Sequence, residues 1–356
     1  MPTWYSEPHI ALAVVFVVVG FYVLIRGADF LVEGGVSIAK RHGMQPAVIG
    51  ATIVAFGTSL PELVVTLGSC LKAWQLGQMG DPDGPAAIAV GNIVGSNIFN
   101  IGAILGITAM IRVIPVPRST FRLDYPLMFV AMTLMILFSL PIGDEPPTIG
   151  RIEGLILVLG LIGFTGMAMR MGKIDTSEVE ELSEHAHSSA AAFGFIGIGI
   201  MMLALGGEVA LTGAIKIANS LGMSERVIGL TIMAIGTSLP ELATTVAAAR
   251  RGHTEIAIGN VVGSNIFNVL CIAGISSVIV PLPIAAATLE WDYFWMMGFT
   301  LILLPMLITG KRVGKGEGLL LLVALITYVS LLVIDDTMSN QETAASENEA
   351  AVTAPP

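Results

Sequence analysis

The sequence predicts an all-α integral membrane protein with about ten transmembrane helices, arranged as two inverted five-helix repeats. Three observations support this fold class. The 356-residue chain is 54% apolar and only 12% charged, with a mean hydropathy of +0.83. Its apolar residues form runs long enough to cross a bilayer as helices of about 20 residues. The same two polar motifs occur once in each half of the chain.

The apolar runs are separated by glycine, proline and charged residues. We expect approximate membrane spans at 9–38, 46–71, 86–111, 122–141, 149–170, 192–218, 225–249, 254–279, 290–309 and 317–335. The first run lacks the basic flank and the cleavage site of a signal peptide, so we expect it to be a retained span. Residues 1–170 would then form the first repeat and 192–335 the second. An acidic segment, 171–191, joins them, and a polar tail, 336–356, is expected to be disordered.

The net charge of −10 comes from two acidic segments, 175–184 and 335–349. Outside these segments the acidic and basic residues balance, which excludes an extended basic face for nucleic acid. Cys70 and Cys271 lie in or beside apolar runs and indicate neither a disulfide framework nor a metal cluster. The expected surroundings are therefore the lipid bilayer, with no nucleic-acid partner and no obligatory protein partner.

The two halves are related in sequence. A shift of 179 positions lays 43–62 over 222–241 with 14 identical residues, and a shift of 168 lays 87–107 over 255–275, again with 14. Each half contains an odd number of spans, so the halves must have opposite orientations in the membrane. This is the inverted-repeat plan of secondary transporters, which bind their substrates near the membrane midplane where broken helices meet.

The distribution of basic residues predicts the orientation. If both termini lie outside, twelve bases fall in cytoplasmic loops: Lys40, Arg41, Arg112, Arg118, Arg122, Arg170, Lys173, Arg250, Arg251, Lys311, Arg312 and Lys315. Four fall outside: Lys72, Arg151, Lys216 and Arg226. This bias follows the positive-inside rule and places the acidic joining segment in the cytoplasm.

The first repeated motif is Gly-Thr-Ser-Leu-Pro-Glu, at 57–62 and 236–241, within otherwise apolar runs. A carboxylate inside a membrane span is costly and usually marks a binding or transport site. Proline removes a helical hydrogen bond, and such a break is tolerated at membrane depth only where it faces protein or a polar cavity. Hydroxyls, freed carbonyls and glutamate together suit a hard cation. One copy could be a simple proline kink, but two copies in two halves favour a site.

The second motif is Gly-Asn-x-Val-Gly-Ser-Asn-Ile-Phe-Asn, at 91–100 and 259–268. Ser96 and Asn100 share one helix face, as do Ser264 and Asn268, because each pair is four residues apart. Alone, such a pattern is more often helix-packing than ligand chemistry. Its pairing with a broken, carboxylate-bearing helix in both halves favours a ligand role.

Both motif pairs closely resemble the repeats of the calcium/cation antiporter superfamily, in its sodium/calcium exchanger branch. The resemblance covers residues 9–335 and implies a core of spans 2, 3, 7 and 8, with long tilted spans 1 and 6 moving past it. It implies a cation-binding set of Thr58, Ser59, Glu62, Ser96, Asn100, Thr237, Ser238, Glu241, Ser264 and Asn268, with the backbone carbonyls of Ala55 and Ala234. The proton-coupled branch typically has Gly-Asn near its glutamate and fits less well.

Two departures from the family pattern matter. Many sodium/calcium exchangers have an acid at the position of Asn268, so this site keeps two carboxylates. The segment 171–191 is too short for the regulatory domains of animal relatives, which implies a prokaryotic-type protein in a bacterial or archaeal inner (cell) membrane. Among other charges inside spans, Asp29 and Glu208 occupy corresponding positions. They would either lie at cavity mouths or pair structurally with Arg26 and Lys216, and we expect the pairing.

The predicted function is antiport of Na⁺ and Ca²⁺, which bind as substrates, with no cofactor. Two glutamates in a low-dielectric core give an empty site two negative charges, so crossing the membrane unloaded is prohibitively costly. H⁺- or K⁺-linked Ca²⁺ exchange is the alternative. A channel would lack counterflow. An enzyme is not expected, because no histidine or lysine lies in sequence where it could serve as a base for Ser59 or Ser238.

Overall fold

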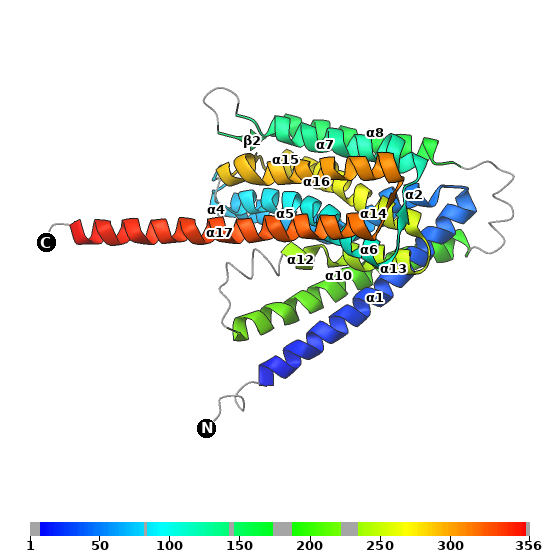
Figure 1. Ribbon diagram of the computed structural model, residues 1–356, viewed down its shortest axis with the longest axis horizontal. Coiled ribbons are helices and arrows are strands. Elements are labelled where there is room, and N and C mark those ends of the chain that lie inside the picture. Colours follow the sequence, from blue (N-terminus) through cyan, green and yellow to red (C-terminus); the bar gives the residue numbers. More distant parts are fainter. Residues whose placement is uncertain (1–7, 82–83, 142–145, 174–186, 222–233, 354–356) are drawn as a thin grey trace.

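The computed structural model describes residues 8–81, 84–141, 146–173, 187–221 and 234–353, and side chains within 10–334 of these. The molecule is a bundle of long helices (Figure 1). Eight described helices are long and apolar enough to cross a membrane, and a ninth span is a bent pair. The predicted helical membrane fold is thereby confirmed. The predicted span at 225–249 lies partly outside the described residues.

The first half contains five spans, three of them interrupted by π-helical turns. Its elements are α1 (Pro8–His42); α2 (Pro46–Ile49), η2 (Gly50–Val54), α3 (Ala55–Thr58) and α4 (Leu60–Leu76); α5 (Pro85–Phe99), η3 (Asn100–Leu105) and α6 (Gly106–Ile111); η4 (Thr120–Asp124) and α7 (Tyr125–Phe138); and α8 (Arg151–Met171). These bounds agree with the predicted spans to within a few residues.

The second half repeats this plan. Its elements are α10 (Ser189–Ser220); α12 (Ala234–Thr237) and α13 (Leu239–Arg250); α14 (Thr254–Phe267), η6 (Asn268–Ala273) and α15 (Gly274–Ile279); η7 (Thr288–Asp292), α16 (Tyr293–Pro305) and η8 (Met306–Gly310); and α17 (Lys315–Thr353). The π-helical turns η3 and η6 both begin at the last asparagine of the second motif. Such turns often occur at functional sites.

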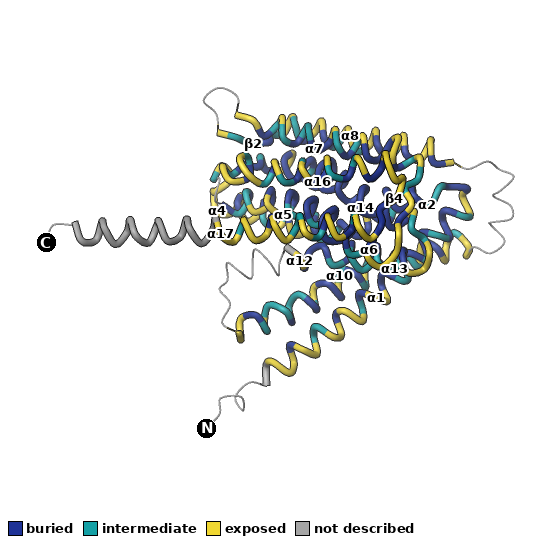
Figure 2. The backbone as a smooth tube through the Cα atoms, viewed as in Figure 1, coloured by how far each residue is buried: buried dark blue, intermediate teal, exposed yellow. Residues whose placement is uncertain are grey.

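The third and eighth spans form the core. In the most apolar windows of these spans, 78% and 83% of the residues are buried, against 22% in α1 and 17% in α17. Figure 2 shows the same gradient, from dark blue tubes in the centre to yellow tubes at the periphery. The spans that carry the second motif are therefore enclosed by protein, whereas the outer helices offer apolar side chains to lipid.

Two short antiparallel sheets connect the halves. Strand β1 (Ile114–Pro115) pairs with β4 (Arg312–Val313), and β2 (Thr148–Ile149) pairs with β3 (Leu282–Pro283). Each sheet therefore contains one strand from each half. The two halves are interwoven rather than placed side by side.

Helices α1 and α10 pack against each other through glycine. A Cβ added at Gly20 would lie 2.4 Å from the backbone N of Ala210, and one added at Gly206 would lie 2.7 Å from that of Leu24. Glycine lets the two backbones approach closely, as at other small-residue membrane interfaces. Figure 1 shows this pair, in blue and green, diverging from the bundle toward the N-terminus.

The predicted disordered tail differs from the structure, in which α17 continues to Thr353. The tail is rich in alanine and glutamate, which favour helix, and it extends a helix that the membrane span has already nucleated. Most of the acidic joining segment, 174–186, lies outside the described residues.

Candidate cation site

Each repeat breaks its second helix just before the motif glutamate. In the first repeat, a break at Ser59 separates α3 from α4 and bends the span by 43°. Pro61 follows in the first turn of α4, where its missing N–H removes no helical hydrogen bond. Ser238 has nearly the same backbone angles, with φ −94° and ψ 9° against −85° and 3° at Ser59. Glu62 and Glu241 therefore lie in the first turn of helices that begin inside the protein.

Side-chain hydrogen bonds join the two broken helices to each other and to the core. Ser59 Oγ donates to Glu241 Oε1 at 2.9 Å. Thr58 Oγ1 donates to Asn260 Oδ1 at 3.2 Å and lies 3.5 Å from Ser264 Oγ. The first motif of the first repeat therefore contacts both motifs of the second repeat.

The second repeat also contacts the second motif of the first repeat. Thr237 Oγ1 donates to Asn92 Oδ1 at 3.4 Å, and Ser238 Oγ donates to Ser96 Oγ at 3.5 Å. The ten side chains of the proposed binding set are all buried: Thr58, Ser59, Glu62, Ser96, Asn100, Thr237, Ser238, Glu241, Ser264 and Asn268.

Four buried oxygens of this cluster have no hydrogen-bond partner among the described residues. They are Glu62 Oε2, Glu241 Oε2, Asn100 Oδ1 and Asn268 Oδ1. Leaving a buried acceptor unpaired costs about 1–3 kcal/mol, and more for a charged group. Two carboxylates and two amide carbonyls, contributed equally by the halves, form an all-oxygen set suited to Ca²⁺ or Na⁺.

The two predicted carbonyl ligands differ. The Ala55 carbonyl accepts the Ser59 N–H at 3.0 Å, and it lies 3.2 Å from Thr58 Oγ1, whose one hydrogen is shared with Asn260 Oδ1. In the second repeat the Ser238 N–H donates to Ile235 O at 3.2 Å. The Ala55 carbonyl is thus occupied within its own helix.

Sequence reasoning missed the asparagines that support this set. Asn260 Nδ2 donates to Thr245 Oγ1 at 2.9 Å, and Asn92 Nδ2 donates to Thr66 Oγ1 at 3.2 Å. Thr245 and Thr66 each lie four residues after the glutamate of the same repeat. The side-chain carbonyls of Asn260 and Asn92 accept from the motif threonines of the opposite repeat, so each asparagine links the two repeats. The available signal was their identical placement in both copies of the second motif.

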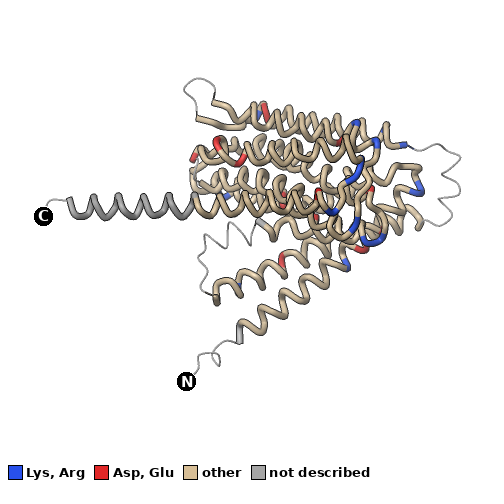
Figure 3. Tube along the Cα trace, viewed as in Figure 1, with Lys and Arg blue, Asp and Glu red and all other residues tan. Residues whose placement is uncertain are grey.

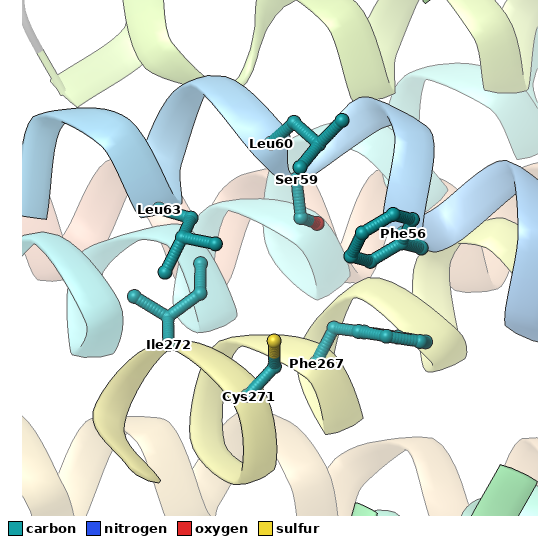
Figure 4. A pocket seen from close by; sticks show the side chains of 7 residues that line it. All are labelled: Phe56, Ser59, Leu60, Leu63, Phe267, Cys271 and Ile272. Carbon is teal, nitrogen blue, oxygen red and sulfur yellow. The ribbon is translucent and has the colours of Figure 1, made fainter. Parts of the chain in front are cut away.

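A narrow apolar crevice reaches Ser59 from one side (Figure 4). It is lined by Phe56, Ser59, Leu60, Leu63, Phe267, Cys271 and Ile272. The rings of Phe56 and Phe267 are 5.7 Å apart between centroids. No part of the crevice is wide enough to hold a water molecule, so the site is closed on this side.

The expected pairing of Asp29 with Arg26 is present, but a second and closer partner, Arg251, comes from the other half of the chain. Arg251 Nη2 lies 2.7 Å from Asp29 Oδ1, whereas Arg26 Nη1 lies 3.9 Å from Asp29 Oδ2. The i,i+3 spacing in α1 gives the longer of the two ion pairs, and Arg251 gives the shorter one. The Lys216 ammonium lies 5.2 Å from the centre of the Phe16 ring, and no described ion pair joins it to Glu208.

Arg251 also contacts Glu33, at 3.6 Å between Nη1 and Oε2. Glu33 Oε1 in turn lies 2.9 Å from His187 Nε2. Because Arg251 follows directly after α13, these contacts connect α1 to the helix that carries Glu241.

Comparisons with known proteins found relatives over most of the chain. The sequence profile of the family described as "Sodium/calcium exchanger protein" matches residues 12–170 and 191–334. The putative antiporter CaxA of Alkalimonas amylolytica is 38% identical over 330 residues, covering 90% of this chain and 98% of its own. The sodium/calcium exchanger MaX1 of Methanosarcina acetivorans is 30% identical over 349 residues, covering 88% and 96%. The solved sodium/calcium exchanger of Methanococcus jannaschii is 28% identical with a TM-score of 0.74, covering 90% of this chain and 98% of that chain.

Proposed function

We propose, since the chain belongs to the sodium/calcium exchanger family, that it is a secondary antiporter exchanging Na⁺ for Ca²⁺ by alternating access. The observation that carries this proposal is the set of four unpartnered oxygens from Glu62, Glu241, Asn100 and Asn268. All four are buried in the motifs through which the two repeats contact each other, and we propose that transported cations are their partners.

The two glutamates give the coupling rule. With both ionised and no cation present, the site holds two negative charges in an environment of low dielectric constant. Moving this charge through an occluded state would cost several kcal/mol per ion. A loaded site avoids the cost, so the rearrangement requires a bound cation in each direction. The protein then exchanges ions rather than releasing one and returning empty.

The proposed ligands are the ten side chains named above with the carbonyls of Ala55 and Ala234. Carboxylate, hydroxyl, amide and carbonyl oxygens at flexible distances suit Ca²⁺, and Na⁺ has nearly the same radius. Mg²⁺ is smaller and gives up its water reluctantly, so we expect it to be a poor substrate. The ions are substrates, and we propose no cofactor and no catalytic step.

The number of carboxylates predicts the electrical character of transport. One Ca²⁺ neutralises Glu62 and Glu241, whereas more than two Na⁺ would leave the site positive. Exchange of one Ca²⁺ for more than two Na⁺ is therefore electrogenic. The neutral Asn268 is essential to this reasoning, because a third ionised carboxylate would change the balance.

The expected orientation places both termini outside the cytoplasm. Most of the Lys and Arg residues drawn in Figure 3 lie at the end of the bundle opposite both termini. By the positive-inside rule, this end faces the cytoplasm. We propose the inner (cell) membrane of a prokaryote as the location.

Uptake of radioactive Ca²⁺ into proteoliposomes, with Na⁺, K⁺ or H⁺ gradients imposed in turn, tests the function. We expect uptake with an outward Na⁺ gradient, stimulated by an inside-positive potential. If only an H⁺ or a K⁺ gradient drives uptake, that ion and not Na⁺ is the coupling ion. Equal uptake without any counter-ion would indicate a channel.

A further inference from the structure

The side-chain amides of Asn100 and Asn268 are each bonded on one side only. Asn100 Nδ2 donates to Asn265 Oδ1 at 2.9 Å, and Asn268 Nδ2 donates to Asn97 Oδ1 at 3.3 Å. Each bond joins one repeat to the other. In both residues the remaining atom, Oδ1, is the buried acceptor without a partner.

Methionine sulfurs determine which way these amides face. Asn265 Nδ2 donates to Met128 Sδ at 3.6 Å, and Asn97 Nδ2 donates to Met296 Sδ at 3.8 Å. A thioether sulfur accepts hydrogen bonds but cannot donate them. The NH₂ group of Asn265 must therefore face the sulfur of Met128, which turns its carbonyl toward Asn100.

The same reasoning fixes the orientation of the Asn100 amide. Because Asn265 presents a carbonyl, Asn100 must present its NH₂ group to it, and its own carbonyl points away. A reversed Asn100 amide would place two carbonyl oxygens in contact and direct a positive NH₂ dipole toward the cation.

The arrangement occurs twice. Positions 97, 100 and 128 correspond to 265, 268 and 296 by the repeat shift of 168, and the residue types are identical. All six side chains are buried. The structure therefore contains the same series of contacts twice. In each copy a methionine sulfur contacts the amide of Asn265 or Asn97, and that amide contacts the amide of Asn100 or Asn268.

We propose that Asn97 and Asn265 are positioning residues for the transported cation. Each holds the side-chain carbonyl of the opposite repeat's ligand asparagine toward the ion, and a methionine sulfur fixes the sense of the contact. This inference rests on the proposed function, since it assumes that Asn100 and Asn268 bind the transported ion. It assigns a function to core residues that would otherwise only fill space.

The test measures equilibrium binding of radioactive Ca²⁺ to the full-length purified protein in Na⁺-free buffer, together with the KM for Ca²⁺ in proteoliposomes. Asn265→Leu lets the Asn100 amide reverse, and we expect the dissociation constant for Ca²⁺ to rise roughly tenfold. Met128→Leu nearly conserves volume and should fold, and we expect Ca²⁺ binding to weaken several-fold.

The matched control is Met132→Leu, one turn further along α7. Met132 Sδ lies 2.8 Å from Thr300 Oγ1 and has no described hydrogen bond with these asparagines. In the Met132→Leu variant Thr300 Oγ1 keeps its bond to Met296 O at 2.9 Å, so this variant should bind Ca²⁺ like the wild type.

A double substitution separates positioning from packing. A carboxylate has an oxygen on both branches, so in an Asn100→Asp background the orientation no longer matters. We therefore expect Asn265→Leu to weaken Ca²⁺ binding little further there, whereas a packing role would add the same loss in both backgrounds. Equal losses in the two backgrounds, or wild-type affinity in both Asn265→Leu and Met128→Leu, would overturn the proposal. A wild type that binds Ca²⁺ but does not exchange it for Na⁺ would instead contradict the proposed function.

Discussion

Substituting alanine for Gly199 should separate α1 from α10. An added Cβ would lie 2.6 Å from Leu31 N, 2.9 Å from Gly27 O and 3.0 Å from Leu31 Cα. All three are backbone atoms, so no side chain can rotate away and the helices must move apart. Overpacking of this kind typically costs about 1–3 kcal/mol.

Gly197→Ala is the matched control, because an added Cβ there meets nothing within 4 Å. Both variants gain the same intrinsic helix propensity, about 1 kcal/mol, so their difference isolates the helix contact. Thermal unfolding of the purified proteins in one detergent should give a Tm lower by a few degrees for Gly199→Ala than for Gly197→Ala. Equal Tm values would refute the conclusion that backbone contact at glycine holds the two helices together.

Three further predictions concern the site, the ion pair and the orientation. Glutamine in place of either motif glutamate should abolish Na⁺-driven Ca²⁺ uptake without loss of thermal stability, because it removes a buried like charge; near-normal uptake would disprove the site. Arg251→Gln breaks the contact with Asp29, and should slow the maximal uptake rate several-fold while costing at most about 1 kcal/mol of stability, since the pair is partly exposed. Arg250→Gln, at an exposed position, serves as its control, and equal rates in the two variants would argue against a role for the pair. An impermeant thiol reagent on intact cells should label a cysteine introduced at Ser220 but not one at Thr309; the reverse would invert the topology.

The fold could be predicted because the two halves of the chain can be compared with each other. Two halves with identical motifs and an odd number of spans require an inverted arrangement, whatever the details of packing. The same logic indicated both glutamates, since a repeated carboxylate in an apolar run has few structural explanations. The prediction of the site therefore depended on residue type and repetition.

The contacts between the halves could not be predicted, because repetition shows which residues correspond and not which residues touch. Asp29 illustrates this: Arg26 is near in sequence, but Arg251 from the other half is nearer in space. Met128 illustrates it too. A methionine in an apolar run is typical of a core filler, and only its distance to Asn265 shows that it accepts a hydrogen bond.

The packing of α1 and α10 bears on how the site could open. The family resemblance implies that these two spans move past the core, and the structure shows how they could do so together. Glycines on both helices put backbone against backbone, as at Gly20 and Gly206, so one helix cannot shift without the other. Their described charged contact with the core is through Arg251, which is partly exposed and therefore inexpensive to break. The contacts of the pair with the core at Gly57 and Gly236 are made by the side chains of Ile200 and Leu211, whereas the contacts within the pair are between backbones. Side chains can rotate and backbones cannot, so this combination favours movement of the two helices as one unit past the core.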